Sequence, residues 1–191
     1  MADITFQQLL LGTQRVLPTA IANKNQDMRI FNTRITNFEG TNMKVFNTNI
    51  MSSIGRKAYN VSLAFYNVVD KSKEVEVPEE PENTEQDTGY QSVFNTDAQK
   101  LQSQQNTVAT AIPSLTNMRI GVRCSCSCYY FWCSYANTKA KCNYGSRFRQ
   151  YIRKTPPYPI GYPPKNPLLI PMVCKHIIHF VEELRGEGLI Q

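Results

Sequence analysis

Residues 119–128 read Arg-Ile-Gly-Val-Arg-Cys-Ser-Cys-Ser-Cys, and residues 172–178 read Met-Val-Cys-Lys-His-Ile-Ile. The first stretch alternates apolar and polar side chains, which predicts a short β-strand that runs directly into a pair of cysteines. The second opens a segment of helical apolar periodicity, which predicts a helix from Pro171 to near Gly186. A strand end and a helix start therefore each carry two potential metal ligands.

The spacing within these motifs suits a metal ion. Successive side chains of a strand point to opposite faces, so Cys124 and Cys126 point to the same side. At a helix start, unpaired backbone N–H groups and the helix dipole favour the thiolate form of a cysteine such as Cys174. Zinc takes four nitrogen or sulfur donors in a tetrahedron. We therefore predict one Zn²⁺ ion held by Cys124, Cys126, Cys174 and His176.

Other uses of the six cysteines stay open. All of them lie between Cys124 and Cys174, and we see no secretory signal, so we expect thiols rather than disulfides. Cys126-Ser127-Cys128 is a second CxC motif, but the unbroken strand alternation favours Cys124 and Cys126. The remaining thiols could ligate a second site or an iron–sulfur cluster. Core packing is their preferred role, and they are Cys128, Cys133 and Cys142.

The first 69 residues predict β-structure after one short helix. Asp3 is the expected cap of that helix, which is limited to two or three turns. The pattern Met-basic-β-branched-Phe-Asn-Thr-x-Ile occurs at residues 28–35 and again at 43–50, which predicts two strands joined by a turn. A further strand is expected over residues 59–69, because apolar side chains recur there with period two.

The charge is unevenly distributed along the chain. The net charge is +4 over residues 1–69, −6 over 70–117 and +8 over 118–191. Residues 70–87 are rich in Glu, Pro, Lys and Thr, which is typical of an arm that is flexible or ordered only by a partner. We therefore divide the chain into a β-rich N-terminal part (1–69), an acidic and Gln-rich extended arm (70–117) and a zinc-stapled C-terminal part (118–191) that ends in a helix. The predicted fold class is α+β, mainly β and irregular.

Aromatic residues and cations gather after the first cysteines. Residues 129–132, Tyr-Tyr-Phe-Trp, are expected to form a small core under the metal site. A later stripe mixes cations with aromatics, as single-strand nucleic-acid binders do, although a loop facing solvent or another subunit is the preferred interpretation. Its members are Arg147, Phe148, Arg149, Tyr151, Arg153 and Lys154. The surrounding connection, residues 143–171, is rich in proline and expected to be extended and stiff.

Motifs of the common enzyme classes are absent from the sequence. It contains no GxxxxGK[ST], GxSxG, HExxH or GxGxxG motif. No apolar run approaches the roughly 20 residues that a membrane helix needs. A zinc ion with four protein ligands has no open position for water and is structural. We therefore expect a chain that is neither an enzyme nor an integral membrane protein.

The two ligand motifs resemble the SWIM-type zinc finger, whose pattern is CxC, a variable spacer and CxH. Val122-Arg123-Cys124-Ser125-Cys126 is similar to the strand entry of that family, and Met172-Val173-Cys174-Lys175-His176-Ile177-Ile178 to its helix entry. The resemblance covers these two short pieces, and it implies the same four zinc ligands.

A broader resemblance extends from Val122 to His176. The run of Cys-Ser-Cys, aromatics, Arg-Lys-Thr-Pro-Pro, Pro-Pro-Lys-Asn-Pro and Ile-Pro-x-x-Cys-Lys-His looks like small virion structural proteins of tailed bacteriophages that carry a SWIM-like ending. This resemblance implies a virion component of the neck, tail or baseplate region, assembled in the host cytoplasm. Its expected partners are other virion subunits and copies of itself in a symmetric assembly, in preference to nucleic acid. The alternative function is a nucleic-acid-binding regulator with a SWIM-like zinc finger.

Overall fold

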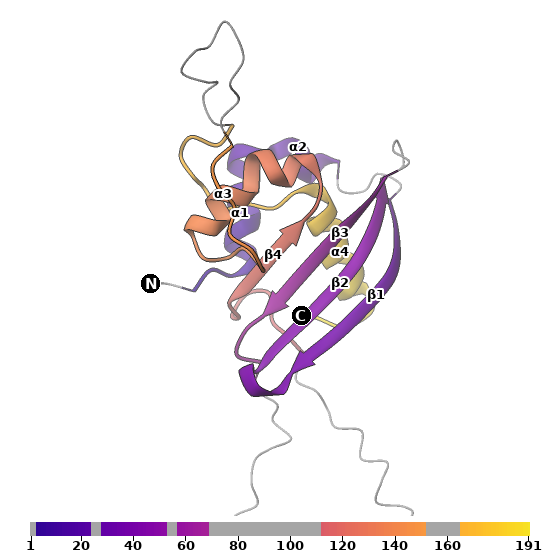
Figure 1. Cartoon of the computed structure of the whole chain (residues 1–191). Coiled ribbons are helices and arrows are strands. Elements are labelled where there is room, and N and C mark those ends of the chain that lie inside the picture. The colour runs from indigo at the N-terminus through magenta and orange to yellow at the C-terminus, as the bar shows by residue number, and fades with distance from the viewer. Residues whose placement is uncertain (1–2, 24–27, 53–56, 69–111, 152–164) are drawn as a thin grey trace, which may run out of the picture. The chain divides into compact units, whose positions relative to one another are not determined.

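The centre of the fold is a four-stranded antiparallel sheet in the order β1-β2-β3-β4 (Figure 1). The strands are β1 (Met28–Phe38), β2 (Met43–Ser52), β3 (Ala58–Phe65) and β4 (Ile120–Cys124). β4 belongs to the predicted C-terminal part, yet it pairs with β3 of the predicted N-terminal part. The two parts therefore share one sheet, and the mixed α and β content agrees with the predicted class.

The computed structural model describes residues 3–23, 28–52, 57–68, 112–151 and 165–191. Met1–Val69 and Ile112–Gln191 together form one compact unit, which is the unit described below. Residues 70–111 of the predicted acidic arm lie outside the described part of the chain. Residues 152–164 of the proline-rich connection also lie outside it.

The repeated sequence pattern forms a β-hairpin, as predicted. β1 and β2 pair from Met28 opposite Ser52 to Phe38 opposite Met43, and a 3₁₀ turn at Glu39–Thr41 joins them. Thr33 and Thr48, which occupy equivalent places in the two copies, lie with their hydroxyl oxygens 3.2 Å apart. The pairing shifts between Phe31 and Arg34, so this edge strand carries a bulge.

The N-terminal helix begins later than its predicted cap. α1 (Phe6–Val16) is capped by Thr5, whose backbone N–H donates to Gln8 Oε1 at 2.9 Å, while the Thr5 side chain accepts from the Gln8 N–H. Asp3 was the wrong choice of cap, because Thr5 and Gln8 together satisfy two backbone N–H groups in a reciprocal capping box. The carboxylate of Asp3 instead lies 3.8 Å from the Arg119 guanidinium. A second short helix, α2 (Pro18–Ala22), follows directly.

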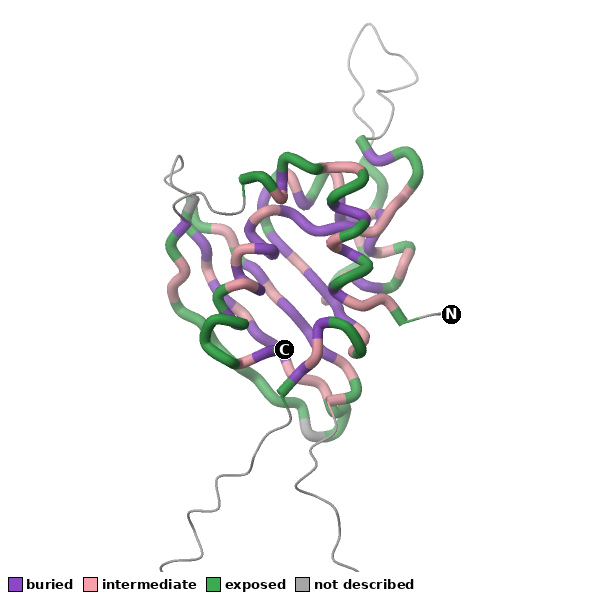
Figure 2. The backbone as a smooth tube through the Cα atoms, turned by 180° about the vertical axis from the view of Figure 1, so that it is seen from behind, coloured by how far each residue is buried: buried purple, intermediate pink, exposed green. Residues whose placement is uncertain are grey.

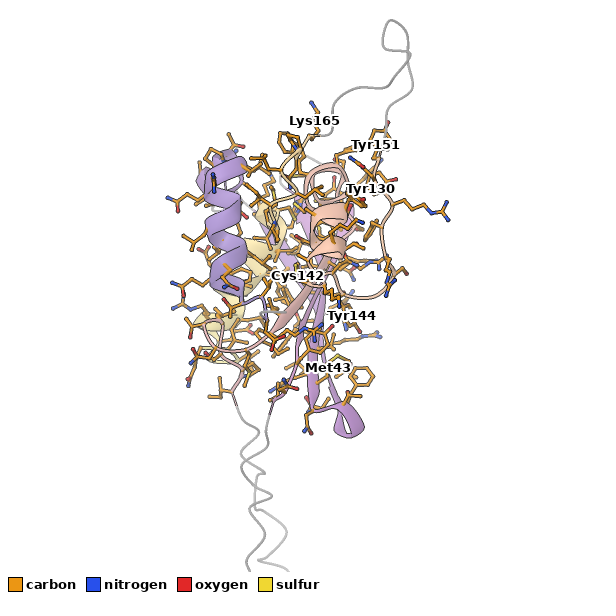
Figure 3. The ribbon with its side chains drawn as sticks, turned by 90° about the vertical axis from the view of Figure 1, so that its left-hand side faces the viewer. Met43, Tyr130, Cys142, Tyr144, Tyr151 and Lys165 are labelled. Atoms are coloured by element: carbon orange, nitrogen blue, oxygen red, sulfur yellow. The ribbon has the colours of Figure 1, made fainter. Side chains whose placement is uncertain are left out.

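The C-terminal helix α4 (Lys175–Gly186) lies on the same side of the sheet as α1, as Figure 3 shows with the sheet nearly edge-on. It begins four residues after the predicted start at Pro171, and Cys174 in extended conformation is its N-cap. The apolar positions predicted for this helix are all buried, and they are Ile177, Ile178, Phe180, Val181 and Leu184.

The hydrophobic core fills the space between these helices and the sheet. The period-two pattern of the third strand was correct for Val61, Leu63 and Phe65, which are fully buried. The strand ends at Phe65, earlier than predicted, and Asn67 has a left-handed backbone conformation (φ 60°) that a strand does not allow. In Figure 2, buried residues gather in the inner strands and on the inner helix faces, while the edge strand β1 is mostly exposed. Among the residues that the structure describes, no helix is both long and apolar enough to cross a membrane.

Candidate metal centre

The fold brings all four predicted metal ligands together. Cys124 ends β4, Cys126 follows two residues later, and Cys174 and His176 come from the first turn of α4. One ligand atom from each of the four residues can be chosen so that all four lie within 4.8 Å of one another, and all four side chains are buried. A tetrahedral zinc site with sulfur ligands holds its donor atoms about 3.5–3.8 Å apart. Small inward movements would therefore let these donors hold one ion.

Ser125, which lies between the two cysteines, hydrogen-bonds to β3. The Ser125 N–H donates to the Asn60 carbonyl at 3.0 Å, and the Asn60 N–H donates to Ser125 Oγ at 2.9 Å. β4 itself ends with Cys124 opposite Val61. The Ser125–Asn60 pair therefore continues the contact with β3 for one residue and leaves both thiols on the buried side.

The chain turns into a helix immediately after Cys126, and one backbone N–H group of the new helix points at the Cys126 sulfur. The Tyr129 N–H donates to Cys126 Sγ at 3.2 Å. Hydrogen bonds from Cys124 and Cys174 are the largest influences that lower the pKa of the Cys126 thiol, and His176 and the Tyr129 N–H act in the same direction. Cys126 is therefore the thiol of this cluster that is best prepared to be a thiolate.

The two other thiols of the cluster have the opposite tendency. Burial raises the pKa of Cys124 and of Cys174 well above the ordinary thiol value. Three neighbouring thiolates without a counter-charge would repel one another in this apolar setting. A bound cation supplies that counter-charge and deprotonates coordinating thiols.

The histidine is buried beside the thiols, and one of its two ring nitrogens has no hydrogen-bond partner in the described part of the chain. His176 is 4% exposed, and its Nε2 atom is buried with no hydrogen-bond partner among the described residues. Its Nδ1 atom lies 3.9 Å from Cys124 Sγ, and its ring packs on Tyr59 with centroids 4.7 Å apart. A buried polar nitrogen without a partner is costly, and three thiols beside an imidazole are a donor set that zinc prefers. These residues therefore fit a metal ion.

The three remaining cysteines do not join this cluster. Burial raises the pKa of the half-buried Cys128 to about 11 and that of the buried Cys142 to about 12. Cys142 Sγ lies 3.6 Å from the Asn137 carbonyl and donates to it, and Cys133 is fully buried in the core. Their positions agree with the preferred packing role.

Three polar side chains that sequence reasoning missed hold the segment leading to Cys174. Asn166 exchanges two hydrogen bonds with the backbone of Ile170, at 2.8 and 3.2 Å. Asn137 does the same with Met172, at 2.9 and 3.0 Å. Thr13 of α1 accepts from the Val173 N–H at 2.9 Å. No motif in a single sequence marks these residues, because each one acts on a distant backbone.

The predicted aromatic core is correct for Tyr129 and in part for Trp132, which is half-buried and packs against the core. Tyr129 is fully buried and donates from its hydroxyl to the Val122 carbonyl at 2.7 Å. Tyr130 and Phe131 are 44% and 41% exposed. These residues lie in a π-helical turn, Tyr129–Cys133, followed by α3 (Ser134–Lys139). Only one side of this helix faces the core, so a run of four aromatics cannot be buried as a block.

Comparison with known proteins adds no relative on which an identity could rest. No protein-family model, no curated protein and no solved structure matches the chain.

Proposed function

We propose that this chain is a non-enzymatic structural subunit of a tailed-bacteriophage particle, in the neck, tail or baseplate region, whose C-terminal part is closed by a structural zinc ion. The observation that carries the proposal is the buried cluster of Cys124, Cys126, Cys174 and His176. This cluster joins the end of β4 to the start of α4. A metal ion there would add to the stability of the fold, because binding free energy contributes to folding free energy.

Zinc is the proposed ion because of the donor types and their burial. Three sulfurs and one imidazole nitrogen suit zinc's borderline-soft character, and they complete its usual coordination number of four. Four buried protein ligands leave no position for a substrate or a reactive water. The proposed role of the ion is therefore structural, and an iron–sulfur cluster is the alternative.

One open pocket in the described part of the chain has a volume of about 380 Å³. Its lining contains neither a nucleophile nor an acid–base pair, and the lining residues are Ile4, Gln8, Leu11, Gly12, Arg15, Ile170 and Pro171. Catalysis by proton transfer or covalent attack needs such groups within hydrogen-bond reach.

The resemblance to phage virion proteins supports the proposed role in a phage particle. Its Asn-Pro and Ile-Pro-x-x-Cys-Lys-His elements contain Asn166, which clamps the backbone at Ile170, and Pro171, whose carbonyl lies against Gly12. These motif residues thus have structural tasks next to the proposed metal site. The proposed location is the virion, and the proposed partners are other virion subunits and further copies of this chain.

Incorporation into particles tests this proposal. Phage carrying Cys174→Ser should yield particles that lack the protein, because the released metal loosens the C-terminal part. Cys128→Ser is the matched control, since Cys128 lies two residues from Cys126 but outside the cluster, and it should be incorporated normally. A chain that is absent from wild-type particles but binds DNA in a salt-sensitive manner would instead support the regulator alternative.

A further inference from the structure

Four aromatic side chains, of which three are exposed and Phe148 is half-buried, form a continuous surface, called here the aromatic patch: Tyr130, Phe131, Phe148 and Tyr151. The Phe131 and Tyr151 ring centroids lie 4.7 Å apart, and those of Tyr130 and Tyr151 lie 6.0 Å apart. Phe148 touches the same group at 6.1 Å from Tyr130. Figure 3 shows Tyr130 and Tyr151 together at one end of the unit.

The patch is open to solvent although its rings are apolar. Tyr130 and Tyr151 are each 44% exposed, and Phe131 is 41% exposed. The π-helical turn at Tyr129–Cys133 carries two of these rings, and such turns occur frequently at functional sites. A contiguous exposed apolar patch in a soluble chain marks an interaction surface.

Cations lie near the patch in space or in the sequence, and acidic residues are absent from its part of the chain. The Arg123 guanidinium stacks on Phe148 at 5.0 Å from the ring centroid, and the exposed Arg147 and Arg149 flank that ring in the sequence. No Asp or Glu occurs between Asp97 and Glu182, whereas this stretch contains eleven Lys and Arg residues. The patch therefore suits a partner that is negatively charged and presents rigid apolar surface.

The chain itself contains a segment of that chemistry. Residues 74–82 read Glu-Val-Glu-Val-Pro-Glu-Glu-Pro-Glu, with a Pro-x-x-Pro spacing from Pro78 to Pro81 and two acidic residues between the prolines. These residues lie outside the described part of the chain. Pro-x-x-Pro segments dock on aromatic surfaces because their extended conformation costs little entropy to fix. Glutamates in such a segment can pair with arginines beside the rings.

We propose that the aromatic patch binds the acidic, proline-containing segment 74–82 of a second copy of this chain. The rings take the two prolines, and the flanking arginines pair with the glutamates. This inference rests on the proposed role as an assembling subunit, and it names one contact through which copies associate. The stretch between Asp97 and Glu182 contains no acidic residue, so its charge is complementary to that of the acidic segment 74–82. This complementarity is the reason for choosing segment 74–82 as the occupant of the patch.

Fluorescence anisotropy with a labelled synthetic peptide of residues 70–90 tests the contact. The receptor is the full chain carrying Pro78→Ala, Glu79→Gln, Glu80→Gln and Pro81→Ala, so that its own segment does not compete. We expect saturable binding that weakens with salt, and a loss of about tenfold or more in affinity for Tyr130→Ala with Tyr151→Ala. Both tyrosines are partly exposed, and unchanged melting temperature and metal content will show that this variant is folded.

Matched controls make the outcome decisive. Leu11→Ala removes another large apolar side chain, 60% exposed on α1 and outside the patch, and should leave peptide binding unchanged. A peptide with Pro78→Ala and Pro81→Ala should bind markedly more weakly. The proposal is overturned if no peptide binds, if the tyrosine variant binds equally well, or if a thymidine 20-mer binds the patch more tightly than the peptide. Each of these results leaves the metal and particle-incorporation tests of the proposed function unaffected.

Discussion

Cys124 Sγ lies 3.9 Å from His176 Nδ1, although 52 residues separate the two in the sequence. This short distance brings the end of β4 next to the first turn of α4. An ion held there would close a long loop. Closing a loop lowers the entropy of the unfolded chain, and the resulting stabilisation grows with the length of the loop. The zinc proposal therefore concerns the stability of the whole C-terminal part.

Removal of the metal should loosen that part reversibly. A strong chelator is expected to lower the melting temperature and to expose α4 to protease, because Cys124 and Cys174 would be left buried without their shared ion. Added Zn²⁺ should restore both properties. Limited proteolysis with mass spectrometry will locate the cleavage sites, and an unchanged digestion pattern in chelator would contradict this prediction.

Thr13→Val should destabilise the protein by about 1–3 kcal/mol. Thr13 is fully buried, and its hydroxyl accepts from the Val173 N–H at 2.9 Å and lies 2.9 Å from the Leu9 carbonyl. Valine keeps the shape but leaves the Val173 N–H buried without a partner. Urea denaturation measures the change in the free energy of unfolding. Thr13→Ser keeps the hydroxyl and is the control, and equal stability of the two variants would refute the assigned role.

Gly12→Ala should also destabilise the protein, although alanine is the better helix former by about 1 kcal/mol. A Cβ atom at Gly12 would overlap the Pro171 carbonyl oxygen, so α1 and the segment before Cys174 would have to separate. Gly186 is the matched control, because a Cβ atom there has no neighbour within 4 Å. Thermal unfolding of Gly12→Ala and Gly186→Ala should therefore show a fall for the first variant only. A stabilised Gly12→Ala variant would show that this close approach does not exist.

The free energy of unfolding should fall as the pH rises from about 9 to 12. Burial raises the pKa of Cys142 to about 12 from an ordinary value of 9.0. In this range the unfolded chain loses the Cys142 proton while the folded chain keeps it, so the unfolded state binds fewer protons and stability decreases. The contribution of this group is fully present below pH 9. Denaturation curves of Cys142→Ala should depend less steeply on pH in this range, and an identical slope would contradict the assignment.

Local patterns were sufficient to predict much of the sheet and the grouping of the four candidate ligands. The period-two residues Val61, Leu63 and Phe65 are buried, and the repeated pattern pairs as a hairpin. Alternation along β4 placed Cys124 on the inner side, where the fold also brings Cys174. The strands and the hairpin depend on neighbours close in the sequence, so a single sequence contains them. The grouping of the ligands joins two distant motifs, and it was predicted from their donor types and spacing.

Features that depend on distant contacts could not be predicted in this way. The shared sheet depends on the pairing of β3 with β4, which no local periodicity predicts. The predicted boundary at residue 118 placed these two strands in different parts of the chain. Tyr130 is exposed because another side of the π-helical turn packs against the core. The clamp formed by Asn137 on the Met172 backbone joins residues 35 positions apart. Composition predicts none of these contacts, because each one depends on which distant segment approaches the residue.

The metal content of the purified full chain tests the central claim most directly. Inductively coupled plasma mass spectrometry should find one zinc ion per chain in the wild type and in Cys128→Ser, and none in Cys174→Ser. Cys128 lies outside the cluster, whereas Cys174 contributes one of its four donor atoms. A wild-type chain without metal, or a Cys174→Ser chain that retains a full equivalent of zinc, would contradict the account.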